Sequence, residues 1–160
     1  RENWKNGKRD GIWEMFQKNG QLRNRENYKN GKLNGLGEEF YDNGQLSWRG
    51  NFKNGETDGP HEYYYKDGQL LHRENWKNGY SDGLSEKFYE NGELCFTENY
   101  KKGKQHGLRK CFDKDGNLTE IEEYEDGNLT KTEEYEDGNL TTTEEYEDGQ
   151  IWRKDGELVE

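Results

Sequence analysis

The sequence predicts an all-β fold: an elongated, single-layer antiparallel meander of tandem β-hairpin repeats. Three observations predict this class, namely a repeat of fixed length, a turn dipeptide that recurs in every repeat, and a composition that disfavours helices. The 160 residues include 21 glycines, no alanine and 22 aromatic residues. Glycine is a poor helix former and aromatic residues favour strands, so a helical bundle is excluded. No apolar run approaches the roughly 18 residues that a membrane-spanning helix needs.

A 24-residue unit occurs five times over residues 1–120 without insertion or deletion. Such a period indicates stacked supersecondary units, in which each unit buries its apolar face only against its neighbours. We therefore expect residues 1–120 to form five hairpin repeats. The columns that hold in all five units are, in the first unit, Trp4, Gly7, Gly11, Phe16, Gly20 and Leu22.

Each unit places Asn-Gly or Asp-Gly just before its leucine, as in Asn43-Gly44. Both residue types tolerate positive φ, so the pair predicts a short hairpin turn. The other turn, between the first two glycine columns, is expected to be longer and to link successive hairpins. The register at the short turn stays open. A two-residue turn pairs Tyr41 with Leu46 and puts Phe40 on the opposite face, whereas a three-residue turn with a bulge brings Phe40 to the leucine side.

After residue 120 the period changes to 11, in the segments 117–127, 128–138 and 139–149. Each copy keeps a leucine and a tyrosine six residues apart, a spacing that predicts both on one face of the sheet. We expect residues 121–160 to continue the sheet as an acidic C-terminal cap of half-repeats. Two-residue Asp-Gly turns predict three cross-strand pairs, all on that face: Tyr124 with Leu129, Tyr135 with Leu140, and Tyr146 with Ile151.

The pattern aromatic-x-Asn-Gly-x-x-x-Gly, followed by aromatic-x-x-Asn-Gly-x-Leu, resembles the MORN repeat in its bacterial variant form. The resemblance covers residues 1–120 in full and 117–156 as half-units, and it implies a twisted array of hairpins without shared catalytic residues. It also implies a choice of functions, because proteins of this variant resemble YwqK-type antitoxins of polymorphic toxin systems, while others act as scaffolds or as surface and secreted proteins. In the unit that matches the pattern most clearly, the residues responsible for the resemblance are Tyr28, Asn30, Gly31, Gly35, Phe40, Asn43, Gly44 and Leu46.

The sequence predicts no catalytic residue, no metal site and no cofactor. His61, His72 and His106 occupy different positions of the repeat, and no serine lies in a nucleophile-elbow sequence. His61 and His72 fall on one hairpin, with His72 near Tyr63, and are expected to be surface side chains of a polar strand. The Tyr-Glu-Asp-Gly segments of the tail fit neither known calcium-loop spacing and are expected to be solvated turns.

Cys95 and Cys111 flank a predicted turn and could therefore oppose each other on neighbouring strands. Two ordinary thiols are the favoured interpretation, because a chain with only two cysteines lacks the dense framework of a disulfide-rich secreted domain. Neither cysteine has a partner at zinc-ligand spacing.

Two aromatic columns in units two to four stand where the end units carry polar residues. A single-layer sheet has little interior, so some of these side chains should be exposed, and exposed aromatic residues are typical anchors of protein interfaces. The alternative, that they form the core and leave the column of Phe16 and Phe40 outside, depends on the unsettled register. The columns predict a protein-binding ladder of Tyr41, Trp48, Tyr65, His72, Tyr89 and Phe96.

Charge is concentrated in the tail. Residues 1–120 contain 21 basic and 20 acidic residues, whereas residues 121–160 contain three basic and 15 acidic residues, a net charge of −12. The acidic balance argues against a nucleic-acid partner and against binding to an anionic membrane. The tail either keeps the sheet soluble or attracts a basic protein. The carboxylates chosen as candidate contacts are Glu123, Glu134 and Glu145.

These observations favour a non-catalytic protein-binding scaffold, most consistent with an antitoxin or immunity-like protein that docks a partner, such as a basic toxin domain, along its sheet face. The alternative is a secreted or surface-displayed structural or adhesive repeat protein. Because the chain begins at Arg1 rather than at Met, we expect it to be a fragment or a processed product. A cytoplasmic location is favoured, with secretion or surface display left open.

Overall fold

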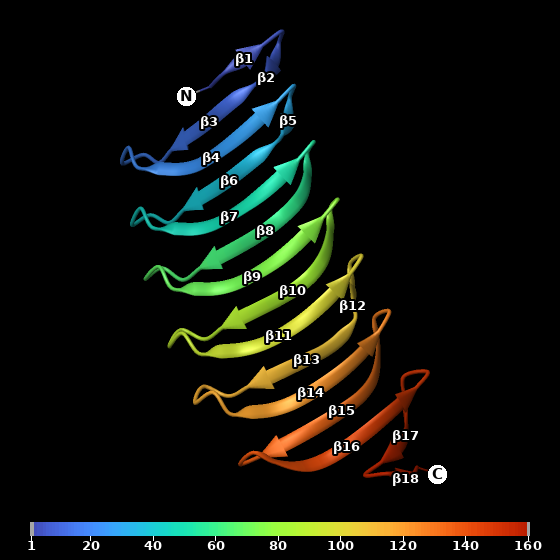
Figure 1. The fold of residues 1–160 in the computed structure, drawn as a ribbon. Helices are drawn as coiled ribbons and strands as arrows, with labels where there is room; N and C mark the ends of the chain where they lie inside the picture. The colour runs from blue at the N-terminus through green and yellow to red at the C-terminus, as the bar shows by residue number, and fades with distance from the viewer. Residues whose placement is uncertain (1, 160) are drawn as a thin grey trace. The chain divides into compact units, whose positions relative to one another are not determined.

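The structure is a computed structural model that describes residues 2–159. The described residues form strands and turns but no helix, and so none of them could provide a membrane-crossing helix. Contacts within the chain divide it into two units, Arg1–Tyr80 and Ser81–Glu160. In each unit, strands that follow one another in sequence pair side by side in a single antiparallel layer (Figure 1). The predicted all-β meander of tandem hairpins is confirmed.

Unit 1, coloured blue to green in Figure 1, has a main ladder with the order β3-β4-β6-β7-β8-β9. The pair β1-β2 forms a separate two-stranded ladder, and β5 pairs with β4. The strands are β1 (Trp4–Lys5), β2 (Lys8–Arg9), β3 (Gly11–Phe16), β4 (Leu22–Lys29), β5 (Lys32–Leu33), β6 (Gly35–Phe40), β7 (Leu46–Lys53), β8 (Glu56–Tyr64) and β9 (Leu70–Lys77).

Unit 2 has the order β10-β11-β13-β14-β15-β16-β17-β18, and β12 pairs with β11. The first strand, β10, begins at the last residue of unit 1. The strands are β10 (Tyr80–Phe88), β11 (Leu94–Lys101), β12 (Lys104–Gln105), β13 (Gly107–Phe112), β14 (Leu118–Glu125), β15 (Asn128–Glu136), β16 (Asn139–Glu147), β17 (Gln150–Lys154) and β18 (Glu157–Leu158).

In each 24-residue repeat, the turn before the recurring leucine, such as Leu46, is a wide loop rather than a two-residue turn. In the second repeat the loop spans 41–45, the Tyr41 N–H donates to the Gln45 carbonyl over 2.8 Å, and the Gly44 N–H donates back to the Tyr41 carbonyl over 2.9 Å. Gly44 has a φ of +84°, which glycine adopts without strain. The Asn43 side chain accepts from the Gln45 N–H over 3.0 Å and so stabilises the loop locally.

The register left open by the sequence is settled by a bulge. Phe40 pairs with Leu46 and Glu39 pairs with Trp48, so Ser47 is the extra residue of the β6-β7 ladder. The same shift occurs at the corresponding place in the other hairpins of this type. Because one inserted residue reverses the alternation of side chains, Phe40 and Leu46 share one face while Trp48 lies on the other.

The second turn of each repeat is the tight one, so the prediction that it is the longer turn is wrong. Lys29 pairs with Lys32 around a two-residue turn, in which Asn30 has a φ of +51° and Gly31 a φ of +83°. Positive φ at both central residues defines the type I′ turn that matches the twist of a hairpin. Gly35, with a φ of +105°, does not close this turn but marks the irregularity that follows it.

The tail pairs as predicted, yet its tyrosines do not share one face. Tyr124 pairs with Leu129, Tyr135 with Leu140, and Tyr146 with Ile151. A bulge in each hairpin again inserts one residue, so a leucine and a tyrosine six apart on one strand lie on opposite faces. The Tyr135 hydroxyl accordingly donates to Glu133, whereas the Tyr146 hydroxyl donates to Glu144 on the other face.

Neither unit has a conventional hydrophobic core. No hydrophobic residue among residues 2–159 is fully buried, and the buried side chains are polar: His61, Ser85, Glu98 and Thr132. Stability must therefore come from the continuous backbone ladders and from half-buried rings that pack across strands. The two interpretations of the aromatic columns, one inside and one outside, are both too simple, since Phe40, Tyr64 and Trp48 are all half-buried although Trp48 lies on the face opposite the other two.

Candidate protein-binding face

Six rings gather on one face of unit 1, which we call the aromatic face. They come from three adjacent strands, because Trp48 pairs with Tyr63, and Tyr63 in turn pairs with His72. The strand alternation places the remaining rings on the same face. The aromatic face consists of Trp48 and Phe52 on β7, His61 and Tyr63 on β8, and His72 and Trp76 on β9.

The rings of the aromatic face form a connected cluster. His61 lies at its centre, with its ring centroid 5.5 Å from Trp48, 5.6 Å from Phe52 and 5.8 Å from Trp76. Tyr63 lies 6.5 Å from Trp48 and is stacked on His72 at 5.6 Å. Edge and offset contacts at these separations stabilise aromatic pairs beyond the area that they bury.

His61 is the most enclosed member of the cluster, with only 3% of its surface exposed. Its Nε2 lies 3.1 Å from the Asn51 carbonyl oxygen, which can only accept, so Nε2 carries the proton and donates. The prediction of a surface histidine on a polar strand is therefore wrong for His61. The sequence could not show this, because the rings that cover His61 come from the two neighbouring strands.

Glycine makes room for these rings. A Cβ atom at Gly50 would lie 2.6 Å from His61 Cε1 and 2.6 Å from Trp48 Cζ2. The neighbouring repeats carry Glu26 and Glu74 at the corresponding position. Glycine at position 50 therefore leaves the space that a glutamate side chain would take, and the rings of His61 and Trp48 fill that space.

One carboxylate remains at the edge of the cluster. Glu74 pairs with His61 across the β8-β9 ladder and accepts a hydrogen bond of 3.3 Å from the Tyr63 hydroxyl. Burial, and then the charge of Glu74, raises the pKa of Tyr63 above its usual value. Tyr63 therefore stays protonated at neutral pH and presents a fixed donor.

The predicted ladder is brought together only in part. Trp48 and His72 are joined through Tyr63, which contacts both rings. Tyr41 lies in a wide loop, where its hydroxyl donates to the Tyr64 carbonyl over 2.6 Å and the Lys66 ammonium lies 5.9 Å from its ring centroid. Tyr65 begins the corresponding loop of the third repeat. The Tyr41 side chain thus ties its loop to the next hairpin.

Two predicted residues, Tyr89 and Phe96, lie in unit 2. The Tyr89 hydroxyl donates to the Phe112 carbonyl over 2.8 Å, as Tyr41 does to its own partner. Phe96 pairs with Cys111, and the Arg109 guanidinium lies 5.1 Å from the Phe96 ring centroid. Arg109 also forms ion pairs with Glu122 and, at 3.9 Å, with Glu98.

Both cysteines are free thiols, in line with the favoured interpretation. Because Cys111 pairs with Phe96, Cys95 lies one residue out of register with it. Burial raises the pKa of the Cys111 thiol to about 11, which keeps it protonated at neutral pH. Among the described residues, no group of three or more His, Cys, Asp and Glu side chains is arranged to hold a metal ion.

The three predicted tail carboxylates do not form one surface. Glu123 and Glu145 both pair with Lys131, and Glu145 also pairs with Arg153. Glu134 lies on the opposite face, where it pairs with Glu120 and Thr142. The acidic tail therefore presents carboxylates on both faces of its sheet.

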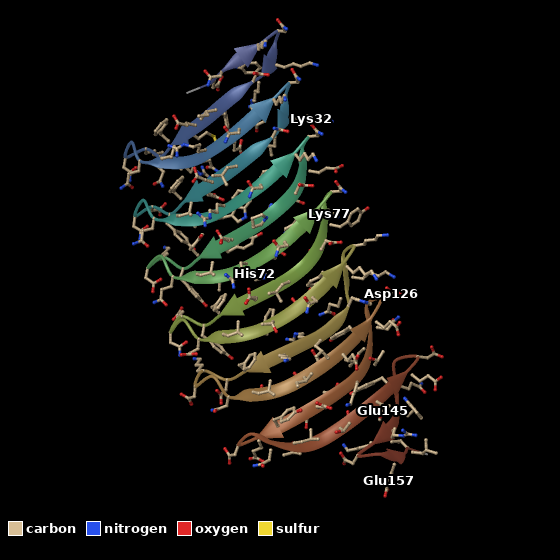
Figure 2. All side chains as sticks on the ribbon, in the orientation of Figure 1. Lys32, His72, Lys77, Asp126, Glu145 and Glu157 are labelled. Carbon is tan, nitrogen blue, oxygen red and sulfur yellow. The ribbon has the colours of Figure 1, made fainter. Side chains whose placement is uncertain are left out.

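Sequence reasoning missed a cluster of exposed lysines at one edge of unit 1. The net charge of residues 1–120 does not reveal this cluster, because acidic residues elsewhere in that segment cancel the positive charge. Figure 2 shows Lys32 and Lys77 at the hairpin tips. The lysines that flank the tight turns of this unit are Lys5, Lys8, Lys29, Lys32, Lys53 and Lys77.

The sequence analysis also missed the structural role of an asparagine that recurs at one position of the repeat. The Asn27 side-chain amide donates to the Leu36 carbonyl over 2.6 Å, and Asn51 donates to the Pro60 carbonyl over 3.3 Å. These bonds satisfy carbonyls where the ladder between neighbouring strands is irregular, near Gly35 and Gly59. The signal was present in the sequence, because asparagine occupies this position in all five 24-residue units.

The repeated unit also matches a known family. The family model described as the MORN repeat variant matches residues 9–30, 33–54, 57–78, 81–102 and 105–126. The chain belongs to the MORN repeat variant family. MORN repeats are generally protein- or membrane-binding modules, and the family is a non-catalytic repeat scaffold.

The other comparisons add little to the MORN assignment. No curated protein matches this chain. Among solved structures, the chain is similar to a mutant of S. aureus TarM in complex with fondaparinux, alpha-GlcNAc-glycerol and UDP, at 11% identity and a TM-score of 0.35. The match covers 75% of this chain and 21% of that protein. At this TM-score the likeness carries no argument about function.

Proposed function

We propose that this MORN protein is an antitoxin or immunity-like factor that docks a basic partner protein. The observation that carries the proposal is the aromatic face of unit 1, where rings from three strands cluster around the buried His61 and the other five rings remain partly exposed. Exposed Trp and Tyr side chains held rigidly by their neighbours are the usual anchors of protein interfaces.

The charge of the tail supports a basic partner. Residues 121–160 carry a net charge of −12, which would speed the approach of a basic protein and make it sensitive to salt. Toxin domains that act on nucleic acid carry such basic surfaces, and an acidic protein can cover them. In this proposal the aromatic face supplies the affinity and the tail carboxylates supply the association rate.

The test measures binding between the purified chain and the toxin domain encoded beside its gene. Trp48→Ala should weaken the equilibrium binding at least about 30-fold, the loss typical of an interface hot spot. Phe16→Ala is the matched control, because Phe16 is an exposed ring outside the aromatic face. Equal binding by both variants, or a gene neighbourhood without a toxin domain that binds, would contradict the proposal.

A second measurement addresses the tail. The triple variant Glu123→Gln, Glu134→Gln and Glu145→Gln should slow association at about 50 mM salt and lose this effect at about 500 mM, where exposed charges are screened. The control removes the same number of charges from exposed positions outside the tail, with Glu56→Gln, Glu90→Gln and Glu93→Gln. Equal association rates for both triple variants would remove the tail from the proposal.

A further inference from the structure

A groove runs beside the wide loops of unit 1, and we call it the loop groove. The three loops span 17–21, 41–45 and 65–69 and follow one another along one edge of the unit (Figure 1). The groove has a volume of 660 Å³, which lies within the range of about 300–1,000 Å³ that small-molecule sites occupy. The side chains considered below are those of Phe16, Lys18, Arg23, Phe40, Tyr41 and Lys66, all of which line it.

Hydrogen bonds between the loops hold the walls of the loop groove in place. Gln17 Nε2 donates to the Tyr41 carbonyl over 3.2 Å and so joins the first loop to the second. The second loop is joined to the third hairpin by the Tyr41 hydroxyl, which donates to the Tyr64 carbonyl over 2.6 Å, and by Asn43 Nδ2, which donates to the Lys66 carbonyl over 2.9 Å. A site whose walls are already ordered loses less entropy when a ligand binds.

Three cationic side chains line the loop groove. Lys18 and Lys66 come from the first and third loops, and Arg23 is the bulge residue of the β3-β4 ladder. The Lys66 ammonium lies 5.9 Å from the Tyr41 ring centroid. Within residues 2–159, none of these three cations forms an ion pair. Cations that share a groove without carboxylate partners favour an anionic ligand, and a guanidinium can bind phosphate through two parallel hydrogen bonds.

The carboxylates near the loop groove offset this charge only in part. Glu39 contributes to the lining, but it pairs with Trp48 and alternates with Phe40, so its side chain lies on the face of the aromatic rings. Asp42 lies in the second loop and is exposed. Of the described lining residues, Asp42 is therefore the one whose carboxylate opposes an anion.

Aromatic rings line the same groove. Phe16 is 54% exposed, and Phe40 and Tyr41 are half-buried beside it. A planar ligand group could gain an offset or edge contact with the exposed Phe16 ring. The loop groove thus offers an aromatic surface and an anion site together, which fits a phosphate ester that carries a ring.

The other repeats do not combine these charges. The residues that correspond to Arg23 are Ser47, Leu71, Cys95 and Thr119, and those that correspond to Lys18 are Asp42, Lys66, Glu90 and Lys114. Only the first repeat has a cation at both positions, so the charge of the loop groove is not a general property of the repeat.

We propose that the loop groove binds a phosphate monoester that carries an aromatic group. The phosphate lies among Lys18, Arg23 and Lys66, and the aromatic group packs against Phe16. The site does not depend on the proposed function, because Phe40 of the groove and Trp48 of the aromatic face lie on opposite faces of the sheet.

The probes are AMP and phenyl phosphate, which share a ring and a phosphate, and ribose 5-phosphate, which has no ring. Titrations followed by amide NMR should show saturable shifts in residues 17–23 and 41–47. Ribose 5-phosphate should bind about two- to tenfold more weakly than the better ring-bearing probe, the effect expected for one aromatic contact. Tighter binding of AMP identifies a nucleotide as the source of the ester, and tighter binding of phenyl phosphate identifies a phosphorylated phenol.

Single substitutions test each part of the site. Arg23→Gln should weaken binding about tenfold, as expected for the loss of hydrogen bonds to a charged group. Lys29→Gln is the matched control, because it removes one exposed cation of the same strand outside the groove. Phe16→Ala should reduce the affinity for AMP to that for ribose 5-phosphate, and Asp42→Asn should increase the affinity for all three probes. Unchanged amide signals in β9 report that each variant is folded.

Three results would overturn the inference. The first is that neither ring-bearing probe gives saturable shifts in the groove residues. The second is that ribose 5-phosphate binds as tightly as both ring-bearing probes, so that the ring is not recognised. The third is an equal loss of affinity in Arg23→Gln and Lys29→Gln, which would mean that the probes respond to overall charge and not to this groove.

Discussion

Gly50 is the residue on which the packing of the aromatic face depends. It stands where two neighbouring repeats carry glutamate, and it lies against both His61 and Trp48. Its φ is not in the left-handed region, so its role is to leave space and not to permit an unusual backbone. A side chain there must displace rings that several neighbours hold in place.

We therefore expect Gly50→Ala to lower the free energy of unfolding by about 1–3 kcal/mol, the usual cost of overpacking. The control is Gly37→Ala, whose Cβ would meet Phe52 at a less severe 3.1 Å. Urea denaturation of both variants measures the difference. Equal stabilities would mean that the rings around His61 yield easily and that the face is not rigid.

Arg49 and Glu62 form an ion pair on the face opposite the aromatic rings. The Arg49 guanidinium, helped by the Tyr64 hydroxyl, lowers the pKa of Glu62 against the opposing effect of burial. A carboxyl whose folded pKa is lowered stabilises the fold above its unfolded pKa, and this contribution is lost as pH falls through the folded value.

The stability of wild type should therefore fall as pH drops below the usual glutamate range, near about 4.3, and the variant Glu62→Gln should show a smaller fall. Denaturant unfolding at neutral pH and at steps below the usual glutamate pKa measures the two curves. Glu93→Gln, at an exposed loop residue, controls for the loss of one carboxylate. If stability falls with pH in parallel for wild type and Glu62→Gln, the ion pair of Arg49 and Glu62 does not contribute to the pH dependence of stability.

At the scale of the element, the repeat is built from two kinds of turn with different chemistry. The tight turn needs positive φ at two successive residues, as at Asn54 with +55° and Gly55 with +94°. The wide loop needs it only at its glycine and uses the preceding Asn or Asp as a local acceptor. Both turns contain Asn-Gly, which is why the dipeptide alone could not tell them apart.

Substitution at Asn54 tests the assignment of the tight turn. Asn54→Ala should cost about 1–2 kcal/mol of stability, because alanine disfavours the left-handed region. Asn54→Gly should be close to neutral, since glycine accepts that conformation. Thermal and urea unfolding measure both. If the alanine and glycine variants are equally stable, the positive φ of the type I′ turn does not determine the stability of the hairpin.

At the scale of the whole molecule, the chain folds without a fully buried hydrophobic residue among residues 2–159. Hydrogen-bonded ladders and half-buried rings replace a packed interior, as expected for repeats that contact only their neighbours. Burial of apolar surface gives unfolding its positive heat-capacity change, and exposure of polar surface lowers it.

The heat-capacity change of unfolding should accordingly lie below about 12–15 cal/mol/K per residue, the usual value for globular proteins with a packed core. Differential scanning calorimetry of the intact chain at several pH values measures it. A value within the usual range would mean that the sheet buries apolar surface against a second copy or another layer in solution.

The sequence by itself determined the period, the hairpins and the tail pairs such as Tyr124 with Leu129, because these depend on local turn chemistry and on spacing along the chain. Only the tertiary structure decided which side chains share a face. One bulge residue per hairpin, such as Ser47, reverses the alternation, and its position follows from hydrogen bonds between strands. The burial of His61 was decided in the same way, since it is made by rings that only strand pairing brings together.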